Sequence, residues 1–92
     1  MIELSYQILF SRRAKKELLA LPQDQRIRIE LALKQFAAHP DLRHDVVKVK
    51  DSPKKVPRYR LRIGEYRAMF FIHHDLLIIE IITIGKKENF SY

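Results

Sequence analysis

Arginine side chains recur at every second position near the middle of the chain. Arg58, Arg60 and Arg62 alternate with apolar residues, and Arg67 follows after a short break. The guanidinium group presents a planar fork of N–H donors that matches the oxygens of a phosphate group. It stays protonated in proteins, so arginine binds and neutralises phosphate but is not a conventional general base. This spacing indicates a surface that binds a phosphate-containing ligand.

A β-hairpin is the element that would bring these arginines together. Residues 58–63 alternate between polar and apolar side chains, and Gly64-Glu65 suits a two-residue turn with glycine first. A return strand over 66–73 then places Arg62 directly opposite Arg67. One hairpin face is apolar, and the other gathers Arg58, Arg60, Arg62, Arg67, Met69 and Phe71. Like charges placed directly opposite destabilise a sheet, and such a local conflict is typical of a functional surface.

This arginine face has two interpretations. In one, the long stems cover the sheet and extend their charged ends into water. In the other, the guanidinium groups bind phosphates while Phe71 stacks on a base. Because the charge lies on strands, the second interpretation favours RNA or single strands over reading of the DNA major groove. A turn at His74-Asp75 would place Met69 opposite Glu80 and bring this carboxylate diagonal to Arg67.

The remaining segments predict the elements that surround the hairpin. Apolar residues at helical spacing predict helices over 11–21, with Ser11 as N-cap, and over 24–38. Alternating or β-branched residues predict strands over 4–10, 58–63, 66–73 and 76–84, and residues 46–50 are a short candidate strand. The order β-α-α-β-β-β predicts an α+β fold, with a helical hairpin packed on one face of a twisted, mainly antiparallel sheet. Whether the first strand pairs with the last is left open by the residues.

Length and charge narrow the function. The 92 residues predict a single domain over 1–92, and 18 Lys and Arg against 11 Asp and Glu give a net charge of +7. The excess lies mainly in residues 43–67, so an anionic partner is expected. Four lysines in this region are candidate RNA contacts, with plain solvent exposure the equal alternative for each: Lys48, Lys50, Lys54 and Lys55.

Several classes of protein are excluded or disfavoured. The absence of cysteine excludes a disulfide scaffold and a thiolate metal site, and it fits a cytoplasmic location. The histidines lack the spacing of metal ligands, so no metal and no cofactor are expected. Charged residues interrupt the most apolar stretch, so no membrane span or membrane partner is expected.

The run Arg58–Arg67 resembles a signature of the RelE/ParE superfamily, the toxins of type II toxin–antitoxin systems. In this chain it reads RYRLRIGEYR, against YRLRVGDYR in the family. The first predicted helix, the Leu21-Pro22 junction after it and the closing Ile84-Gly85-Lys86-Lys87 also look like that family. The resemblance extends over nearly the whole chain and implies the RelE-like fold with a cognate antitoxin as partner.

For function, the resemblance implies a ribosome-dependent endoribonuclease, or mRNA interferase, that inhibits translation. RelE-like members cut mRNA in the decoding site without a metal, by attack of a 2′-hydroxyl on the adjacent phosphate. Arg60 and Arg62 fall where the best-known members carry phosphate-binding lysines. Arg67 matches an arginine that holds the scissile phosphate. Lys87 falls where a second arginine stabilises the transition state, and Tyr92 is nearest to a tyrosine that stacks on or activates the nucleophile.

The arginines at positions 60 and 62 shift the expected mechanism toward electrostatics. They would hold the phosphate in line and neutralise its growing charge, and Lys87 would donate a proton to the leaving oxygen. Two other functions remain open. The first alternative is a ParE-like inhibitor of DNA gyrase without nuclease activity. The second is a protein that binds RNA or the ribosome without catalysis. In every version an acidic antitoxin segment is expected to cover the basic surface.

Overall fold

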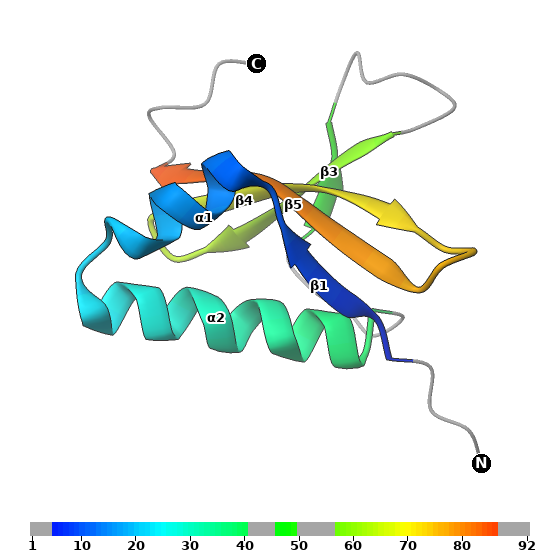
Figure 1. The fold of residues 1–92 in the computed structure, drawn as a ribbon, viewed down its shortest axis with the longest axis horizontal. Helices are drawn as coiled ribbons and strands as arrows, with labels where there is room; N and C mark the ends of the chain where they lie inside the picture. Colours follow the sequence, from blue (N-terminus) through cyan, green and yellow to red (C-terminus); the bar gives the residue numbers. More distant parts are fainter. Residues whose placement is uncertain (1–4, 41–45, 50–56, 87–92) are drawn as a thin grey trace.

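The computed structural model of the chain describes residues 5–40, 46–49 and 57–86. Two helices, α1 (Arg12–Leu19) and α2 (Gln23–Ala38), pack against a five-stranded sheet. The strands are β1 (Gln7–Phe10), β2 (Val46–Lys48), β3 (Arg58–Ile63), β4 (Tyr66–His73) and β5 (Ile78–Lys86). Their order across the sheet is β1-β5-β4-β3-β2, and β1 runs parallel to β5 while the other neighbours are antiparallel (Figure 1). The predicted α+β fold is confirmed.

The helices begin where the sequence predicts and bury one face each. Ser11 caps α1, since its Oγ accepts from the Ala14 N–H at 3.0 Å and donates to the Ile82 carbonyl at 2.7 Å. This hydroxyl therefore ties the start of α1 to β5. Pro22 precedes α2, and its fixed φ suits the entry to a helix. The buried helix residues are Ala14, Leu18, Ile29, Leu33, Phe36 and Ala37.

The core lies between these helices and one face of the sheet. Phe70 on β4 is at its centre and is fully buried. Its ring lies 5.1 Å from that of Phe36 on α2 and 5.9 Å from that of Tyr59 on β3, measured between centroids. Aromatic pairs at such separations add to the stabilisation that comes from buried area. One side of the sheet is thus committed to packing against the helices, and the arginines lie on the other side.

A short first strand leaves part of β5 to be completed by α1. The strand β1 pairs only with Ile78–Ile81, so beyond that point β5 would present unpaired backbone groups. Glu17 on α1 accepts the Ile84 N–H at 3.0 Å and the Thr83 hydroxyl at 2.7 Å. A helix side chain therefore takes the place of the missing strand.

The turn between β4 and β5 differs from the predicted one. The sequence suggests a two-residue turn at His74-Asp75, but the strands are joined by four residues, 74–77, and His73 pairs with Ile78. The carbonyl of Leu77 accepts the Gln7 N–H at 2.8 Å, so the longer turn also serves the pairing of β1. Glu80 consequently stands opposite Phe71 and not opposite Met69. The predicted position diagonal to Arg67 is wrong.

An irregularity in the β4–β5 pairing keeps β5 in the core along its whole length. Phe70 pairs with Ile81 while Met69 pairs with Thr83, so Ile82 is the extra residue of a bulge. The bulge changes which residues face the helices. Ile79, Ile81 and Ile84 are all buried as a result, and Thr83 is directed to Glu17 instead.

Within the described ranges, neither helix has the length and apolar character needed to cross a membrane.

Candidate nucleic-acid interface

The β3–β4 hairpin forms as predicted and aligns the arginines. Arg62 pairs with Arg67, Arg60 with Met69 and Arg58 with Phe71. Gly64 has a φ of 60°, which L-residues rarely adopt, and it occupies the first central position of the turn. A Cβ atom at this position would lie 2.7 Å from Nη2 of Arg28 on α2. Glycine is therefore required by the backbone conformation of the turn, whereas the Arg28 guanidinium is the end of a flexible side chain that can move aside.

Arg67 is the most enclosed of the four arginines. It is 7% exposed, and its Nη1 donates to the carbonyl of Tyr66 at 3.1 Å and to that of Gly64 at 3.4 Å. These two carbonyls lie at the hairpin turn, so the turn itself orients the guanidinium group. Residues directly opposite on a sheet have Cβ atoms about 4.5–5.5 Å apart. The side chains of Arg62 and Arg67 therefore leave the backbone close together.

A hollow of about 210 Å³ opens between these side chains. It is lined by Val47, Arg60, Arg62 and Arg67, and we call it the cationic hollow. A water molecule takes up about 30 Å³ of liquid, so the hollow has room for a phosphate group. Three guanidinium side chains around one concave site are suited to binding a phosphodiester and to neutralising charge on its oxygens.

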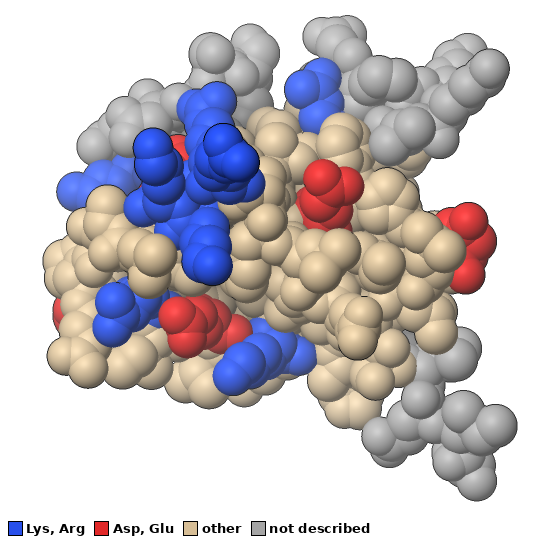
Figure 2. All heavy atoms as spheres, viewed as in Figure 1, with Lys and Arg blue, Asp and Glu red and all other residues tan. Residues whose placement is uncertain are grey.

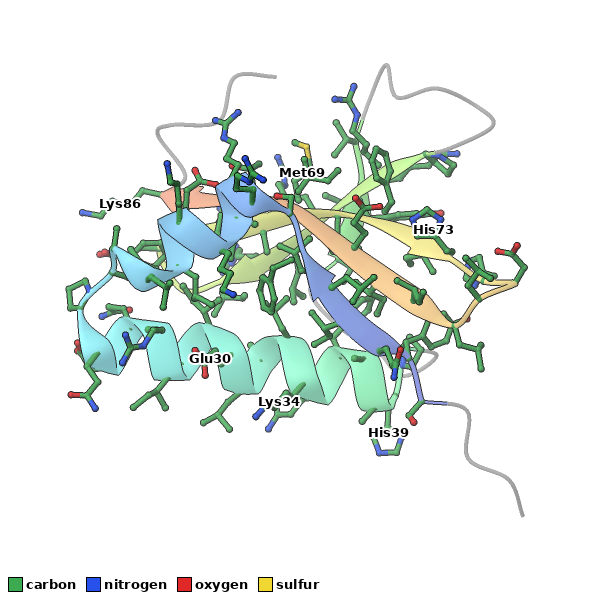
Figure 3. The ribbon with its side chains drawn as sticks, in the orientation of Figure 1. Glu30, Lys34, His39, Met69, His73 and Lys86 are labelled. Carbon is green, nitrogen blue, oxygen red and sulfur yellow. The ribbon has the colours of Figure 1, made fainter. Side chains whose placement is uncertain are left out.

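The opposite end of the same sheet face has a different composition. Arg58, Phe71 and Glu80 are neighbours in one row across three strands. His73 lies two residues beyond Phe71, and its Nε2 is 3.1 Å from Glu80 Oε1. In Figure 3, Met69 and His73 both lie on the side of the sheet away from α2. We call these four residues, Arg58, Phe71, His73 and Glu80, the distal cluster.

The other predicted contact residues do not join this face in the described structure. Lys48 pairs with Tyr59, whose ring packs on Phe70, so Lys48 belongs to the helix side of the sheet at its edge. It is exposed but directed away from the cationic hollow. The remaining candidates lie outside the described residues: Lys50, Lys54, Lys55, Lys87 and Tyr92. Among the residues that are described, no group of three or more His, Asp or Glu side chains could hold a metal ion.

The sequence alone did not identify the His73–Glu80 pair. The two-residue turn expected at His74-Asp75 placed Glu80 opposite Met69, and no partner was expected for His73. The usable signal was parity, because His73 is separated from Arg67 and Phe71 by even numbers of residues and so shares their face. The unpredicted turn length then brought Glu80 to His73.

Comparison with known proteins places the chain in a family. The model of the ParE toxin of the type II toxin–antitoxin system parDE matches residues 8–89. The chain belongs to this toxin family. It is thus a toxin of the RelE/ParE superfamily, as its central arginine run suggested. No curated protein matches its sequence significantly.

Solved structures show that the toxin shares its fold with RelE proteins. The archaeal RelE–RelB complex from Pyrococcus horikoshii OT3 matches with a TM-score of 0.76 and 22% identity, over 94% of this chain and 99% of that one. RelBE2 from Mycobacterium tuberculosis matches with a TM-score of 0.69 and 21% identity, over 90% and 99%. The isolated E. coli RelE toxin matches with a TM-score of 0.69 and 21% identity, over 95% and 89%. At these identities the likeness concerns the fold.

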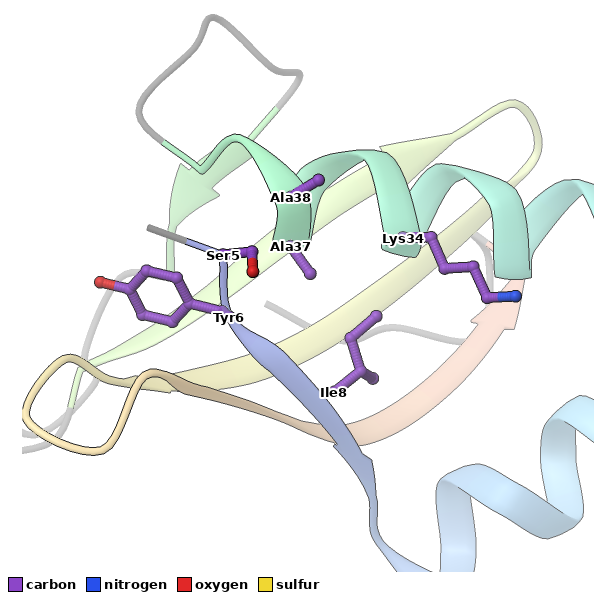
Figure 4. Close-up of a pocket in the computed structure, with 6 residues that line it drawn as sticks. All are labelled: Ser5, Tyr6, Ile8, Lys34, Ala37 and Ala38. Atoms are coloured by element: carbon purple, nitrogen blue, oxygen red, sulfur yellow. The ribbon is translucent and has the colours of Figure 1, made fainter. Parts of the chain in front are cut away.

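Two further surface features of the toxin lie outside the arginine face. Figure 2 shows Lys and Arg side chains gathered where Figure 1 places α1, the helix whose exposed residues include Arg12, Arg13, Lys15 and Lys16. A second hollow, of about 290 Å³, lies between β1 and the end of α2 (Figure 4). Its lining is mainly apolar, with Lys34 its single charged residue in the described chain. Of the two hollows, the cationic hollow is the better candidate for binding a phosphate group, because three arginines line it.

Proposed function

We propose that this toxin is an endoribonuclease that cleaves mRNA on the ribosome. The observation that carries the proposal is the cationic hollow, in which Arg60, Arg62 and Arg67 surround one site. Membership of the RelE/ParE superfamily is compatible with this function and with the gyrase-directed alternative considered below. The substrate is a phosphodiester of RNA, because the proposed nucleophile is the adjacent 2′-hydroxyl.

The proposed reaction exchanges one P–O bond for another. The 2′-oxygen bonds to phosphorus and releases its proton to an acceptor in the ribosomal site, while the P–O5′ bond breaks. The products are a 2′,3′-cyclic phosphate and a 5′-hydroxyl, which forms when the leaving 5′-oxygen takes up a proton. Arg67, fixed by the carbonyls of Gly64 and Tyr66, would hold the phosphate in line. Arg60 and Arg62 would neutralise the charge that grows on its oxygens.

Two residues beyond the described structure complete the proposal. Lys87 follows directly after the end of β5, and we assign it the donation of a proton to the 5′-oxygen. Tyr92 is assigned to stacking on or activating the nucleophile. The basic lysines Lys48, Lys50, Lys54 and Lys55 are assigned to general contacts with RNA, which do not depend on base sequence.

Primer extension on a defined mRNA, with and without purified ribosomes, tests the function. We expect cuts within decoding-site codons only when ribosomes are present. Arg67→Ala should lower the cleavage rate by roughly 10²–10³-fold, the usual effect of removing one electrostatic stabiliser. Arg62→Ala tests the same hollow at an exposed position, where folding is not at risk. Lys34→Ala removes a positive charge on α2, remote from the hollow, and should cleave like the wild type.

The second candidate is a ParE-like inhibitor of DNA gyrase. The specific observation in its favour is the family model, which describes a ParE toxin. Arginines at 60 and 62, in place of the lysines of RelE-like members, also favour it. Gyrase supercoiling assays with added toxin should show no inhibition if our proposal holds. Inhibition of gyrase without any ribosome-dependent cut would show that the toxin acts on gyrase and is not the proposed nuclease. Salt-dependent RNA binding without a cleavage product would show that it binds RNA without catalysis.

We also propose that a cognate antitoxin binds this toxin through an acidic segment. Several structural neighbours are toxin–antitoxin complexes, and this chain carries a net charge of +7. Exposed apolar residues on α2 offer contact area, since Ile27 is 46% and Leu31 is 54% exposed. Isothermal titration with the product of the neighbouring gene should give a saturable, salt-sensitive heat. Absence of binding at low salt would contradict this partner.

A further inference from the structure

The distal cluster combines groups that recognise a nucleic-acid base. Phe71 offers an aromatic ring on the open side of the sheet, partly exposed. Glu80, directly opposite on β5, has a side chain that is 43% exposed. Arg58, opposite Phe71 on its other side, supplies a cation. Rings stack on bases of any kind, whereas a carboxylate accepts hydrogen bonds only from bases that offer donors.

The pairing between His73 and Glu80 fixes the carboxylate without using it up. The His73 side chain is 33% exposed, and its Nε2 contacts Oε1 of Glu80. An ionised carboxylate has about four acceptor positions over its two oxygens, so most of them are left for a ligand. The His73 ring also lies 6.4 Å from that of Phe71, measured between centroids. His73 is therefore next to both the ring of Phe71 and the carboxylate of Glu80.

The neighbours of the cluster give the site an apolar wall and an unpartnered donor. Leu9 on β1 stands beside Glu80 in the same row and is 50% exposed. Nε of Arg58 is buried and has no hydrogen-bond partner in the described structure. A row of Leu9, Glu80, Phe71 and Arg58 thus runs across four strands. A nucleotide can make contacts with each of these groups. Its base can pack against the apolar wall and the ring and donate hydrogen bonds to the carboxylate, and its phosphate can pair with the cation.

We propose that the distal cluster is a base-binding subsite that prefers guanine. Guanine is the base whose pairing edge presents two adjacent donors, the ring N1–H and the amino group, which match the two oxygens of Glu80. Phe71 lies four positions along β4 from Arg67, which corresponds to about 13 Å between their Cα atoms. The bound base therefore belongs to a neighbouring nucleotide and not to the one whose phosphate occupies the cationic hollow. The subsite rests on the proposed RNA-directed function and would give it a sequence preference.

Direct binding of mononucleotides tests the subsite without requiring cleavage. The four ribonucleoside 5′-monophosphates are titrated into isotope-labelled toxin, and backbone amide shifts are followed by NMR. We expect GMP to shift the amides of Phe71, His73 and Glu80 and to bind about tenfold more tightly than UMP, as one good bidentate contact allows. Equal binding of all four nucleotides at this cluster, or no shift there at millimolar concentrations, would overturn the preference for guanine.

Three variants separate base recognition from folding and from general attraction. Glu80→Gln replaces one acceptor with a donor, so the preference for GMP should disappear while weak binding persists. Phe71→Ala removes the stacking surface and should weaken all four nucleotides by about tenfold. Asp75→Asn removes a carboxylate in the adjoining turn, outside the cluster, and should bind like the wild type.

The same variants distinguish failure of the subsite from failure of the nuclease. If the wild type cuts mRNA and Glu80→Gln cuts it with an unchanged sequence preference, the subsite is wrong and the nuclease stands. If no cut occurs but GMP still selects the distal cluster, the subsite stands and the nuclease is wrong. A loss of fold in either variant is detected in the same NMR spectra, and Phe71→Leu then replaces Phe71→Ala.

Discussion

The two hairpins that share β4 start from similar sequence patterns but end with different chemistry. The β3–β4 hairpin turns in two residues around Gly64, and its pairing is regular from end to end. The β4–β5 hairpin turns in four residues, with Leu77 at a φ of 54°, and its pairing contains a bulge. The first hairpin gathers arginines at its turn. The second brings a histidine and a glutamate together near its own.

This contrast shows that turn length decides which charges meet. A glycine in the left-handed region closes a tight turn at little cost, so the opposing residues follow directly from the sequence. A leucine in that region is strained by contact between Cβ and the backbone. It is held there because its carbonyl receives the Gln7 N–H of β1. Long-range pairing therefore determines the second turn, whereas local chemistry determines the first.

The largest effect is expected from a residue on which both hairpins depend. Phe70→Ala would remove the buried ring that contacts Phe36 and Tyr59, and we expect a loss of about 3–5 kcal/mol in the free energy of unfolding. Urea denaturation followed by circular dichroism measures it. Met69→Ala, one residue along and facing the other side, should cost clearly less. Similar losses at both positions would contradict the assignment of the two sheet faces.

A smaller loss is expected at the tight turn. Gly64→Ala would place a Cβ in the left-handed region and against the Arg28 guanidinium, and we expect a loss of about 1–2 kcal/mol. Thermal denaturation measures the change. Glu65→Ala, at the next turn position where φ is not positive, should lie within about 0.5 kcal/mol of the wild type. Unchanged stability of Gly64→Ala would show that the turn adapts more freely than its geometry indicates.

A gain in the free energy of unfolding, and not a loss, is expected at the four-residue turn. Leu77→Asn would place in the left-handed region a residue that tolerates it, and we expect a gain of about 0.5 kcal/mol. Leu76→Asn is the matched control, since Leu76 is 63% exposed and its φ is not positive. The two variants are compared by chemical denaturation in one buffer. A gain at Leu76 and not at Leu77 would contradict strain as the cause.

The difference between the hairpins also explains what the sequence could predict. The register from Arg58 to Phe71 followed from alternation and one Gly-Glu turn, and both helices followed from their apolar spacing. The bulge at Ile82 and the four-residue turn were not predictable, because no glycine or other local signal marks them. The parallel pairing of β1 with β5 joins residues about 70 positions apart and was left open.

The candidate site divides along the same line. The cationic hollow was visible as an arginine pattern, because its three arginines are close in sequence and a single turn sets their positions. The enclosure of Arg67 by the carbonyls of its own turn required the folded hairpin. Glu80 could be assigned to the correct face but not to its partner, because a shift of two residues in the pairing exchanges Met69 for Phe71.

The smallest effect on stability is expected where we place base recognition. Glu80→Gln would remove the ionic part of a contact between side chains that are 33% and 43% exposed, and such pairs contribute little. We expect the free energy of unfolding to change by less than about 0.5 kcal/mol. Chemical denaturation at neutral pH measures it, beside the wild type.

Glu17→Gln is the informative comparison, because the Glu17 carboxylate accepts two hydrogen bonds that complete the edge of β5. Hydrogen bonds to charged groups contribute more than those between neutral ones, so this variant should lose about 1 kcal/mol. A loss at Glu80 as large as that at Glu17 would show that the His73–Glu80 pair holds the hairpin together. The pair would then be explained by stability, and the contrast between an RNA-facing hairpin end and a structural edge would no longer hold.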